Sequence, residues 1–470
     1  EVEMKTDTIT AIATALSDSG IGMIRISGEK AIQIGNKVFS TKSGKHILNE
    51  VETHTIHYGF IVDEENHVVD EVMVSVMKAP RSYTMEDTVE ISCHGGVLVM
   101  QKILETVLKG GARMAEPGEF TKRAFLNGRI DLTKAEAVID VIHSQNEYAL
   151  NSSMSQLQGT LSREVKKLRE EIIYEIAFIE SALDDPEHIS LDGYPERLKE
   201  KVDNISGKID KLLNTADNGK LIKEGIATVI VGKPNAGKSS LLNILVGEER
   251  AIVTDIAGTT RDILEEHIKL HGIGLNIIDT AGIRDTKDTV EKIGVERAKQ
   301  YAKDADLILY MVDSSVNLDE SDEEILSLIG DKNVIILLNK TDLDTVVTEE
   351  TMEVAIRKCI PDRGKIAMIR TSTKDNTGIE EFENTIKKMF FEGNLHNNGE
   401  IVITNLRHKE ALQDAYHSLE LVEQSILDDM PEDFYSIDLM SAYASLGTII
   451  GEEVGEDLVN EIFSKFCMGK

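Results

Sequence analysis

The 470-residue sequence predicts a multidomain protein that combines α/β and all-α parts. Three observations support this fold class. Residues 1–119 combine short strand patterns with a helix pattern, apolar residues recur at helical spacing in 120–220 and again in 385–470, and a strand–glycine loop–helix pattern opens the stretch 221–384. Because helical segments flank the α/β stretch on both sides, we expect one discontinuous helical domain with an α/β domain inserted in it.

The composition disfavours several classes of protein. Acidic side chains number 83 and basic ones 51, and the net charge of −32 opposes unaided, sequence-independent binding to nucleic acid. The three cysteines lie far apart and form no zinc or disulfide pattern. We find neither an apolar run of roughly 18 residues nor a signal-peptide pattern, so we expect no membrane attachment and a cytoplasmic location. Met4 is the natural start that we expect, with residues 1–3 as an addition.

The first 119 residues predict an α+β domain. Strand patterns cover 22–28, 68–77 and 88–92, and a helix pattern covers 97–108 and stops at two glycines, Gly110 and Gly111. Arg25 and Glu90 stand inside strand patterns, where alternation favours side chains that point to solvent. His94 is expected to be a polar turn residue, not a ligand.

The helical stretches follow. Thr133 and Glu136 have the spacing of a capping box. One long helix is expected to carry the stripe Leu157, Leu161, Val165, Leu168 and Ile172, and a break is expected at 184–195. Two further stripes, interpreted as core-facing, are Ile205, Ile209 and Leu212, and Leu412, Tyr416, Leu419, Val422 and Ile426. The acidic cluster 319–324 and the loop 394–398 are expected to be solvated connections.

A phosphate-binding loop is predicted at Gly232–Ser239, between the apolar strand pattern 226–231 and a helix pattern at 240–246. Glycines allow backbone N–H groups to surround a phosphate, and the start of the helix adds its positive dipole end. Lys238 suits the β- and γ-phosphate oxygens, and the Ser239 hydroxyl suits Mg²⁺.

Three further motifs, in the right order, indicate a guanine-nucleotide domain. Asp279–Gly282 closes a strand pattern at 275–278, and its aspartate and glycine suit the surroundings of Mg²⁺ and a γ-phosphate. Asn339–Asp342 ends a strand pattern at 334–338, and the Asp342 carboxylate can accept two hydrogen bonds from guanine but not from adenine. Thr371–Thr373 follows a strand pattern at 366–369 and would contact the base.

The residue that positions the attacking water is not evident from these motifs. Ras-like proteins place a glutamine directly after the glycine of the second motif, and here that position is Ile283. The segment 251–262 lies where a switch loop is expected, and it offers Thr259 or Thr260 as a Mg²⁺ ligand. Another group must orient the water, or hydrolysis is slow and the domain acts as a timer.

The chain resembles the MnmE (TrmE) family of tRNA-modification GTPases over nearly its whole length. The motifs that carry this resemblance are residues 7–14, 22–28, 83–87, 116–128, 234–239 and 251–262, and the C-terminal Phe466–Lys470. The run 116–128 and the C-terminal tail are far more specific than any nucleotide motif alone.

The resemblance implies a domain plan and a nucleotide site. The domains would be an N-terminal folate-binding and dimerisation domain at 1–119, a helical domain at 120–220 and 385–470, and a Ras-like GTPase domain at 221–384. The residues expected to contact GTP are Asn235, Ala236, Gly237, Lys238, Ser239, Ser240, Thr254, Asp255, Ile256, Ala257, Gly258, Thr259, Thr260, Asp279, Thr280, Ala281, Gly282, Asn339, Lys340, Asp342, Ser372 and Thr373.

The resemblance also implies two cations and a catalytic carboxylate. Ser239 and Thr260 would hold Mg²⁺, and K⁺ would be surrounded by Asn235, Thr254, Ile256 and Thr259. Glu291 would act on the attacking water, with Lys238 as the second catalytic group of the nucleotide site. GTP hydrolysis would be stimulated by K⁺ when two nucleotide domains meet across a homodimer, because a cation against the phosphates offsets the developing charge.

For the modification itself, the resemblance implies a folate site and protein partners. Arg25, Glu90, Arg129 and Lys470 would contact 5-formyltetrahydrofolate or a related folate, and Cys467 would lie beside it in a role that stays open. An FAD-containing partner, MnmG, would join the dimer in a heterotetramer or a larger complex and make most of the contacts with tRNA. Together the two proteins would install an aminomethyl-type group, such as carboxymethylaminomethyl, at C5 of uridine 34.

Two departures from the family pattern and two other functions stay open. Residues 15–20 replace a Pro-Pro-Gly-Arg-Gly-Gly loop, which leaves contacts near Arg25 undefined, and Ser372–Thr373 replaces Ser-Ala. The chain would otherwise be a GTPase of another class, such as a ribosome-assembly factor, or a folate-dependent one-carbon transferase with a vestigial nucleotide domain.

Overall fold

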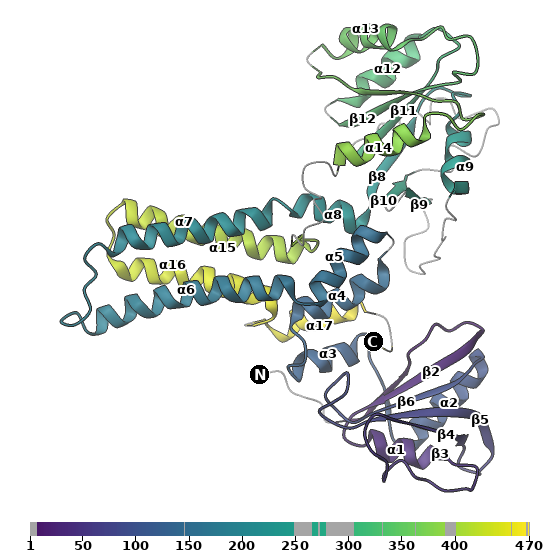
Figure 1. Cartoon of the computed structure of the whole chain (residues 1–470), viewed down its shortest axis with the longest axis vertical. Helices are drawn as coiled ribbons and strands as arrows, with labels where there is room; N and C mark the ends of the chain where they lie inside the picture. The colour runs from purple at the N-terminus through teal and green to yellow at the C-terminus, as the bar shows by residue number, and fades with distance from the viewer. Residues whose placement is uncertain are drawn as a thin grey trace. The chain divides into compact units, whose positions relative to one another are not determined.

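The computed structural model describes residues 7–144, 146–248, 266–270, 273–278, 305–330, 332–361, 363–390, 401–452, 454–466 and 469. The chain forms two compact units. The first comprises segments within 1–142, 154–206 and 411–470, and the second comprises segments within 143–153 and 207–410. Each unit is therefore built from pieces of chain that are far apart in the sequence (Figure 1).

The first unit contains a seven-stranded sheet with the order β3-β4-β5-β6-β2-β1-β7. Neighbouring strands are antiparallel except β1 and β7, which are parallel. The strands are β1 Ile9–Ile12, β2 Ser19–Ser27, β3 Phe39–Ser40, β4 Thr55–Val62, β5 Val68–Met77, β6 Thr88–Gly95 and β7 Arg113–Met114. On β5 the side chains of Val72, Val74 and Val76 are buried and that of Met73 is exposed, so alternate residues pack towards α1 (Ala31–Val38) and α2 (Val97–Gly110).

The elements predicted for this region are present with small shifts in their bounds. The strand predicted at 68–77 is β5, and the strand predicted at 22–28 begins earlier, at Ser19. The predicted helix runs to Gly110 and ends at Gly111, whose φ of +117° suits a C-cap. The turn assigned to His94 is wrong, because β6 continues to Gly95 and the His94 Nδ1 lies 2.7 Å from the Asp70 carboxylate across the sheet.

Helices, among them the long α6, α7, α15 and α16, form the rest of the first unit (Figure 1). The helices that lie wholly or partly in it are α3 Glu119–Leu126, α4 Leu132–His143, α5 Glu147–Leu157, α6 Thr160–Asp184, α7 Tyr194–Leu213, α15 Leu406–Leu427, α16 Glu432–Ile450 and α17 Glu456–Ser464. α6 and α16 lie side by side, and Arg169 of α6 forms an ion pair with Glu452, two residues beyond the end of α16 and 283 residues along the chain. The interpretation of the helical stripes as core is confirmed at Leu161, Leu168 and Leu412, which are buried.

Two details of the helical prediction are wrong. Thr133 does not cap α4, because the helix begins at Leu132 and the Asp131 carboxylate accepts the hydrogen bond from the Lys134 backbone N–H, at 3.0 Å. The stripe from Leu157 to Ile172 does not lie on a single helix, because Gly159, with φ +81°, separates α5 from α6.

The second unit contains a six-stranded sheet with the order β13-β12-β11-β8-β10-β9, in which only the pair β9–β10 is antiparallel. The strands are β8 Ile226–Val231, β9 Glu266–Leu270, β10 Ile273–Ile277, β11 Leu307–Asp313, β12 Asn333–Asn339 and β13 Ala367–Arg370. The helices with described positions are α8 Ala216–Glu224, α9 Lys238–Glu248, α12 Glu320–Ile329, α13 Glu349–Cys359 and α14 Ile379–Phe390. Tyr310 and Met311, consecutive on β11, are both fully buried in different core clusters, so both faces of the sheet are covered.

The sequence identified the strands of this unit better than its connections. The strand predicted at 226–231 has these bounds in β8, and the one predicted at 334–338 extends by a residue at each end in β12. The solvated connection predicted at 319–324 is wrong, because Asp319 caps α12 and Asp322 is 1% exposed. The loop predicted at 394–398 lies outside the described residues. Among the described residues, no helix is both long and apolar enough to span a bilayer.

Residues near the two ends of the long segment of the second unit meet directly. The Ile403 backbone N–H donates to the Thr215 hydroxyl at 3.1 Å, across 188 residues of sequence. A Cβ atom at Gly219 would lie 2.0 Å from the Ile403 carbonyl oxygen. Glycine at position 219 is therefore what permits this close approach of the backbones.

Candidate functional site

The predicted phosphate-binding loop connects β8 to α9, and its two glycines are required by the space around them. Gly232 has φ +152°, and a Cβ there would lie 2.3 Å from the Met311 carbonyl oxygen. Gly237 has φ +107°, and a Cβ there would lie 2.2 Å from the Asn339 side-chain nitrogen. Any other residue at either position would strain the backbone and displace a neighbour.

Lys238 is the first residue of α9, and its ammonium group turns back into the loop. The Nζ donates to the carbonyl oxygens of Gly232, at 2.6 Å, and Lys233, at 2.9 Å. Burial lowers the pKa of Lys238 to about 8. The predicted neighbours Ser239 and Ser240 follow in the first turn of the same helix, where backbone N–H groups favour an anion.

Asn339 joins the phosphate-binding loop to the predicted guanine motif. It ends β12 with a fully buried side chain, and its Nδ2 donates to the Ala236 carbonyl oxygen at 2.8 Å. Its Oδ1 accepts from the Thr373 backbone N–H at 3.1 Å. One amide side chain thus holds three predicted segments together, and this explains why an asparagine stands there: an amide both donates and accepts.

Asp342 and Lys340 lie at the edge of this site. The Ser372 hydroxyl donates to Asp342 Oδ1 at 3.2 Å, which orients the carboxylate proposed to read the base. Lys340 has φ +64°, and its Nζ lies 2.5 Å from the Asp313 Oδ2. Burial raises the pKa of the Asp313 carboxyl, but the hydrogen bonds from Lys340 and Ser315 exceed that effect and lower it. Asp313 was not among the predicted residues because no strand was predicted at 307–313. The apolar run Leu307–Val312, ending in an aspartate, was the signal.

The other residues predicted for the nucleotide and tail sites lie outside the described residues. They are Thr254, Asp255, Ile256, Ala257, Gly258, Thr259, Thr260, Asp279, Thr280, Ala281, Gly282, Glu291, Cys467 and Lys470. The structure therefore brings together the loop at 232–240, the segment 339–342 and Ser372–Thr373, and it leaves the two segments between β8 and β11 as predictions.

Arg25 and Glu90 form the centre of the predicted folate site in the first unit. They are directly paired across β2 and β6, with the Arg25 Nε 2.8 Å and its Nη2 2.7 Å from the Glu90 Oε1. Their side chains are 13% and 20% exposed. The interpretation that each points to solvent is therefore wrong: each is half-buried and neutralised by the other.

Aromatic rings surround these charges. The Arg25 Cζ lies 5.6 Å from the ring centroids of both Tyr83 and Phe120, and the Arg129 Cζ lies 4.8 Å from the Tyr83 ring. Arg129 also donates to the Tyr83 carbonyl oxygen at 3.0 Å. A pocket of about 440 Å³ is lined by His54, Met77, Pro80, Arg81, Ser82, Tyr83, Met85 and Arg129. The guanidinium groups of Arg81 and Arg129 and the ring of Tyr83 line this pocket and suit a flat, anionic ligand, while Arg25 lies against the same ring and is paired with Glu90.

The C-terminal tail reaches the same place. Arg25 Nη1 donates to the Gly469 carbonyl oxygen at 3.2 Å, and Gly469 has φ +88°. A Cβ at Gly469 would lie 2.5 Å from the Ile12 carbonyl oxygen on β1, so only glycine fits this contact without a shift. The tail glycine and Arg25, both within motifs that carry the family resemblance, are thus in direct contact.

The motif 116–128 is explained by a network of charges behind this site. Arg123, 7% exposed at its side chain, bonds to carboxylates of Asp7, Glu86 and Glu119 at 2.8–3.1 Å. Arg113 bonds to Asp7 at 2.6 Å and to Glu119 at 2.7 Å. The network fixes α3 to β7 and to the segment around Tyr83, with the buried pair Arg123 and Glu119 at its centre and the partly exposed Asp7 and Arg113 at its edge.

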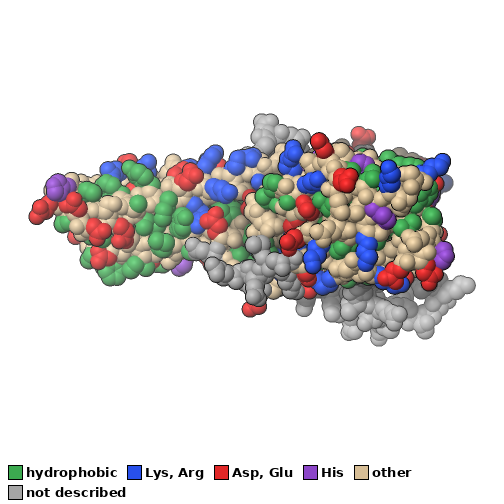
Figure 2. Space-filling view, turned by 90° about the horizontal axis from the view of Figure 1, so that it is seen from below, with side chains coloured by type: hydrophobic (Ala, Val, Ile, Leu, Met, Phe, Trp, Pro, Cys, Tyr) green, Lys and Arg blue, Asp and Glu red, His purple; other side chains and the backbone are tan. Residues whose placement is uncertain are grey.

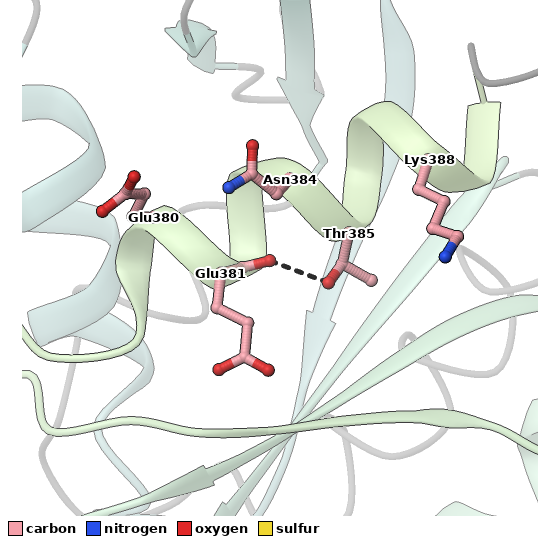
Figure 3. A pocket seen from close by; sticks show the side chains of 5 residues that line it. All are labelled: Glu380, Glu381, Asn384, Thr385 and Lys388. Atoms are coloured by element: carbon pink, nitrogen blue, oxygen red, sulfur yellow. Dashed lines mark hydrogen bonds between the residues drawn. The ribbon is translucent and has the colours of Figure 1, made fainter.

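Other surface features lack convergent groups. On the face in Figure 2, Lys and Arg side chains are interspersed with Asp and Glu, and no continuous basic surface is visible. A depression of about 390 Å³ beside α14 is lined only by residues of that helix, Glu380, Glu381, Asn384, Thr385 and Lys388. In Figure 3 these side chains fan out along the helix, and the drawn bond is from the Thr385 hydroxyl to the Glu381 carbonyl oxygen.

Comparisons with known proteins agree with these sites. Residues 132–467 match the family model described as the MnmE helical domain, and residues 8–129 match that of the GTP-binding protein TrmE N-terminus. A tRNA modification GTPase MnmE from Lachnoclostridium phytofermentans is 59% identical over 99% of this chain and 100% of its own length. Proteins of the same name from Acetivibrio thermocellus and Clostridioides difficile are each 49% identical over 99% of this chain, and over 100% and 99% of their own lengths.

Solved structures add little to this result. A bacterial selenocysteine-specific elongation factor matches 35% of this chain and 28% of its own at 23% identity. Its TM-score of 0.25 is too low to bear on the fold. The sequence relatives and family models carry the comparison.

Proposed function

The chain belongs to the MnmE family of tRNA modification GTPases, and from this premise we propose a K⁺-stimulated GTPase that drives a folate-dependent modification of tRNA. It is a GTP hydrolase that takes part in tRNA modification. The proposed product carries an aminomethyl-type group, such as carboxymethylaminomethyl, at C5 of the wobble uridine, position 34. We propose that an FAD-containing partner, MnmG, acts with it, in the cytoplasm.

The proposed domain plan divides these tasks. A folate-binding and dimerisation domain comprises residues 1–119, a helical domain comprises 120–220 and 385–470, and a Ras-like GTPase domain, 221–384, is inserted in the helical one. The two family models agree with the plan in part: one covers residues 8–129, ten residues beyond the proposed N-terminal domain, and the other covers 132–467, which contains most of both proposed parts of the helical domain.

One observation carries the proposed nucleotide site: the Asn339 amide bonds to Ala236 of the phosphate-binding loop and to Thr373 of the base motif. A single nucleotide can therefore reach Lys238 with its phosphates and Asp342 with its base. Guanine would satisfy the Asp342 carboxylate with two N–H groups, whereas adenine would leave it unpaired.

The proposed cation sites use the same loop. Ser239 and Thr260 would hold Mg²⁺, and Asn235, Thr254, Ile256 and Thr259 would hold K⁺. The described part of this donor set fits, because hydroxyl and amide oxygens are ligands for such hard cations and Asn235, at φ +64°, stands exposed at the turn of the loop. The cations would offset charge that develops on the phosphates, while Glu291 would orient the attacking water.

The proposed folate site is formed by Arg25, Glu90, Arg129 and Lys470. The described residues fit this ligand: the Glu90 carboxylate suits the N–H edge of a pterin, and the guanidinium groups of Arg25 and Arg129 suit carboxylates. Arg25 also contacts Gly469, and this supports a role for the tail and for Cys467 beside the bound folate. When bound, the folate would supply a one-carbon unit, and the residues of this chain would orient it.

The partners follow from charge and family. We propose that the protein is a homodimer whose nucleotide domains meet to activate hydrolysis, and that MnmG joins it in a heterotetramer or a larger complex. With a net charge of −32, this chain is repelled by a phosphate backbone, so most of the contact with tRNA is assigned to the partner.

The test is steady-state GTP hydrolysis in K⁺ and in Na⁺ at equal ionic strength. We expect a large K⁺-specific stimulation that Glu291→Ala abolishes and that Glu380→Ala, a change on the exposed face of α14, retains. Equal rates in the two salts would refute the K⁺ assignment at Asn235 and its partners. Persistent wobble-uridine modification by Lys238→Ala would instead favour a one-carbon transferase with a vestigial nucleotide domain.

A further inference from the structure

Lys233, the second residue of the phosphate-binding loop, directs its side chain away from the loop and towards the start of α12. Its Nζ lies 2.7 Å from the Asp322 Oδ2 and 2.9 Å from the Asp319 Oδ2. The Lys233 side chain is 18% exposed and that of Asp322 is 2% exposed. The contact with Asp322 is thus largely shielded from water, whereas the Asp319 side chain is 57% exposed and adds a weaker, surface contact.

Asp322 is held from two further directions. Tyr310, a fully buried residue of β11, donates a hydrogen bond from its hydroxyl group to Asp322 Oδ1 at 2.7 Å. The backbone N–H of Asp319 donates to Asp322 Oδ2 at 2.9 Å, as part of the capping box of α12. Because a strand and a helix terminus both bind this carboxylate, its position does not depend on its contact with the loop.

The positive charge of Lys233 is stable at neutral pH. Burial disfavours the charged form of Lys233, but hydrogen bonds to Asp322 and Asp319 exceed that effect and raise the pKa of Lys233. The hydrogen bond from Lys233 in turn lowers the pKa of Asp319. Lys233 therefore remains an ammonium group throughout the range in which the enzyme would be assayed.

The backbone of Lys233 lies in the turn that shapes the loop. Its carbonyl oxygen accepts hydrogen bonds from Lys238 Nζ, at 2.9 Å, and from the Ala236 N–H, at 3.3 Å. The residue before it, Gly232, has no side chain to restrict its torsions. When its side chain is held by Asp322, the Lys233 backbone is also restrained, and with it the carbonyl oxygen that binds Lys238 and the Ala236 N–H.

We propose that Asp322 is a positioning residue that acts through Lys233 to preorganise the phosphate-binding loop for the nucleotide. The inference rests on the proposed assignment of this loop to the phosphates of GTP. A loop that is already ordered loses less conformational freedom on binding, so the link strengthens nucleotide affinity and leaves the chemical step unchanged.

A double-mutant cycle tests the link. The affinity for GDP carrying a fluorescent N-methylanthraniloyl group is measured for Lys233→Met, for Asp322→Asn and for the double variant. Each single change is expected to raise Kd about tenfold, as for one lost charge-assisted hydrogen bond, and the double change to raise it no further. Lys233→Arg, which can still reach both carboxylates, is expected to retain affinity within about twofold.

Steady-state kinetics separate positioning from a loss of fold. Lys233→Met and Asp322→Asn are expected to raise KM for GTP by the same factor as Kd and to change kcat by less than about twofold. Lys358→Met is the matched control, since it removes an exposed ion pair between α13 and Glu323 of the same helix α12 and should leave Kd unchanged. Additive effects of the two single changes, or unchanged affinity in both, would overturn the proposal.

Lys238→Ala distinguishes failure of this inference from failure of the proposed site. If Lys238→Ala still binds the nucleotide with unchanged affinity, the assignment of this loop to the phosphates is refuted, and the positioning role of Asp322 is refuted with it. Binding that is lost in Lys238→Ala but unchanged in Lys233→Met and Asp322→Asn would keep the site and refute the positioning role alone.

Discussion

Gly237→Ala is the most direct test of the nucleotide site. The φ of +107° at this position is strained for alanine, at roughly 1–2 kcal/mol. The new Cβ would also lie 2.2 Å from the Asn339 Nδ2, so the amide must move. That movement breaks its bonds to Ala236 and Thr373, each worth about 0.5–1.5 kcal/mol.

The strain lowers stability with or without nucleotide, whereas the two lost bonds, about 1–3 kcal/mol together, misplace the site and correspond to a loss of roughly 5- to 150-fold in nucleotide affinity. The assay is the Kd for fluorescently labelled GDP, measured with the free energy of unfolding in urea. Gly330→Ala is the matched control: Gly330 has φ +51° but no atom within 4 Å of an added Cβ, so it should lose stability without losing affinity. If Gly237→Ala binds GDP as tightly as the parent, the reasoning about Asn339 is refuted.

Three further predictions address charge, folate and stability. The pKa of Lys238 is about 8, and a bound phosphate favours its protonated form. The affinity for GDP should therefore fall by up to tenfold per pH unit above pH 8. Measurements of Kd against pH should show no such dependence in Lys238→Met. Tyr83→Leu removes the ring that contacts the guanidinium groups of Arg25 and Arg129, and it should weaken binding of 5-formyltetrahydrofolate roughly 3- to 30-fold in calorimetry. Tyr58→Leu, on the exposed face of β4, should leave this binding unchanged. Arg123→Met should lower the free energy of unfolding in urea by about 3–5 kcal/mol, because Glu86 loses its arginine and the buried Glu119 keeps only Arg113. An effect no larger than that of Lys465→Met, which breaks an exposed pair, would contradict this expectation.

Local patterns predicted the parts of the fold that depend on neighbours in sequence. The bounds of β8 followed from an apolar, β-branched run that ends at a glycine, and the end of α2 followed from Gly111. The two-glycine loop and Asn339 were likewise evident from their motifs. Each of these features is marked by a short local pattern, although the contacts that require Gly237 and Asn339 come from residues distant in the sequence.

Features that depend on distant partners were not predictable in this way. Arg25 and Glu90 are 65 residues apart, so alternation alone could not show that they neutralise each other across two strands. Asp322 belongs to an acidic cluster, and its burial is compensated by Lys233 and Tyr310 from other elements. A run of charged residues predicts a solvated segment unless the partners of its charges are known. Spacing in the sequence does not reveal partners that come from distant elements.

The contact between Thr215 and Ile403 has a consequence for the order of folding. Arg169 and Glu452 close a loop of 283 residues, and the Thr215–Ile403 contact bypasses 188 of them, which leaves an effective loop of about 95. Chain-closure entropy then opposes the pairing of α6 with α16 less, by about 1 kcal/mol, if the second unit is already folded. A second unit that has already folded therefore brings α6 and α16 closer together along the chain and speeds their pairing. A bulky residue at Gly219, which weakens the Thr215–Ile403 contact, is expected to slow the refolding of these helices.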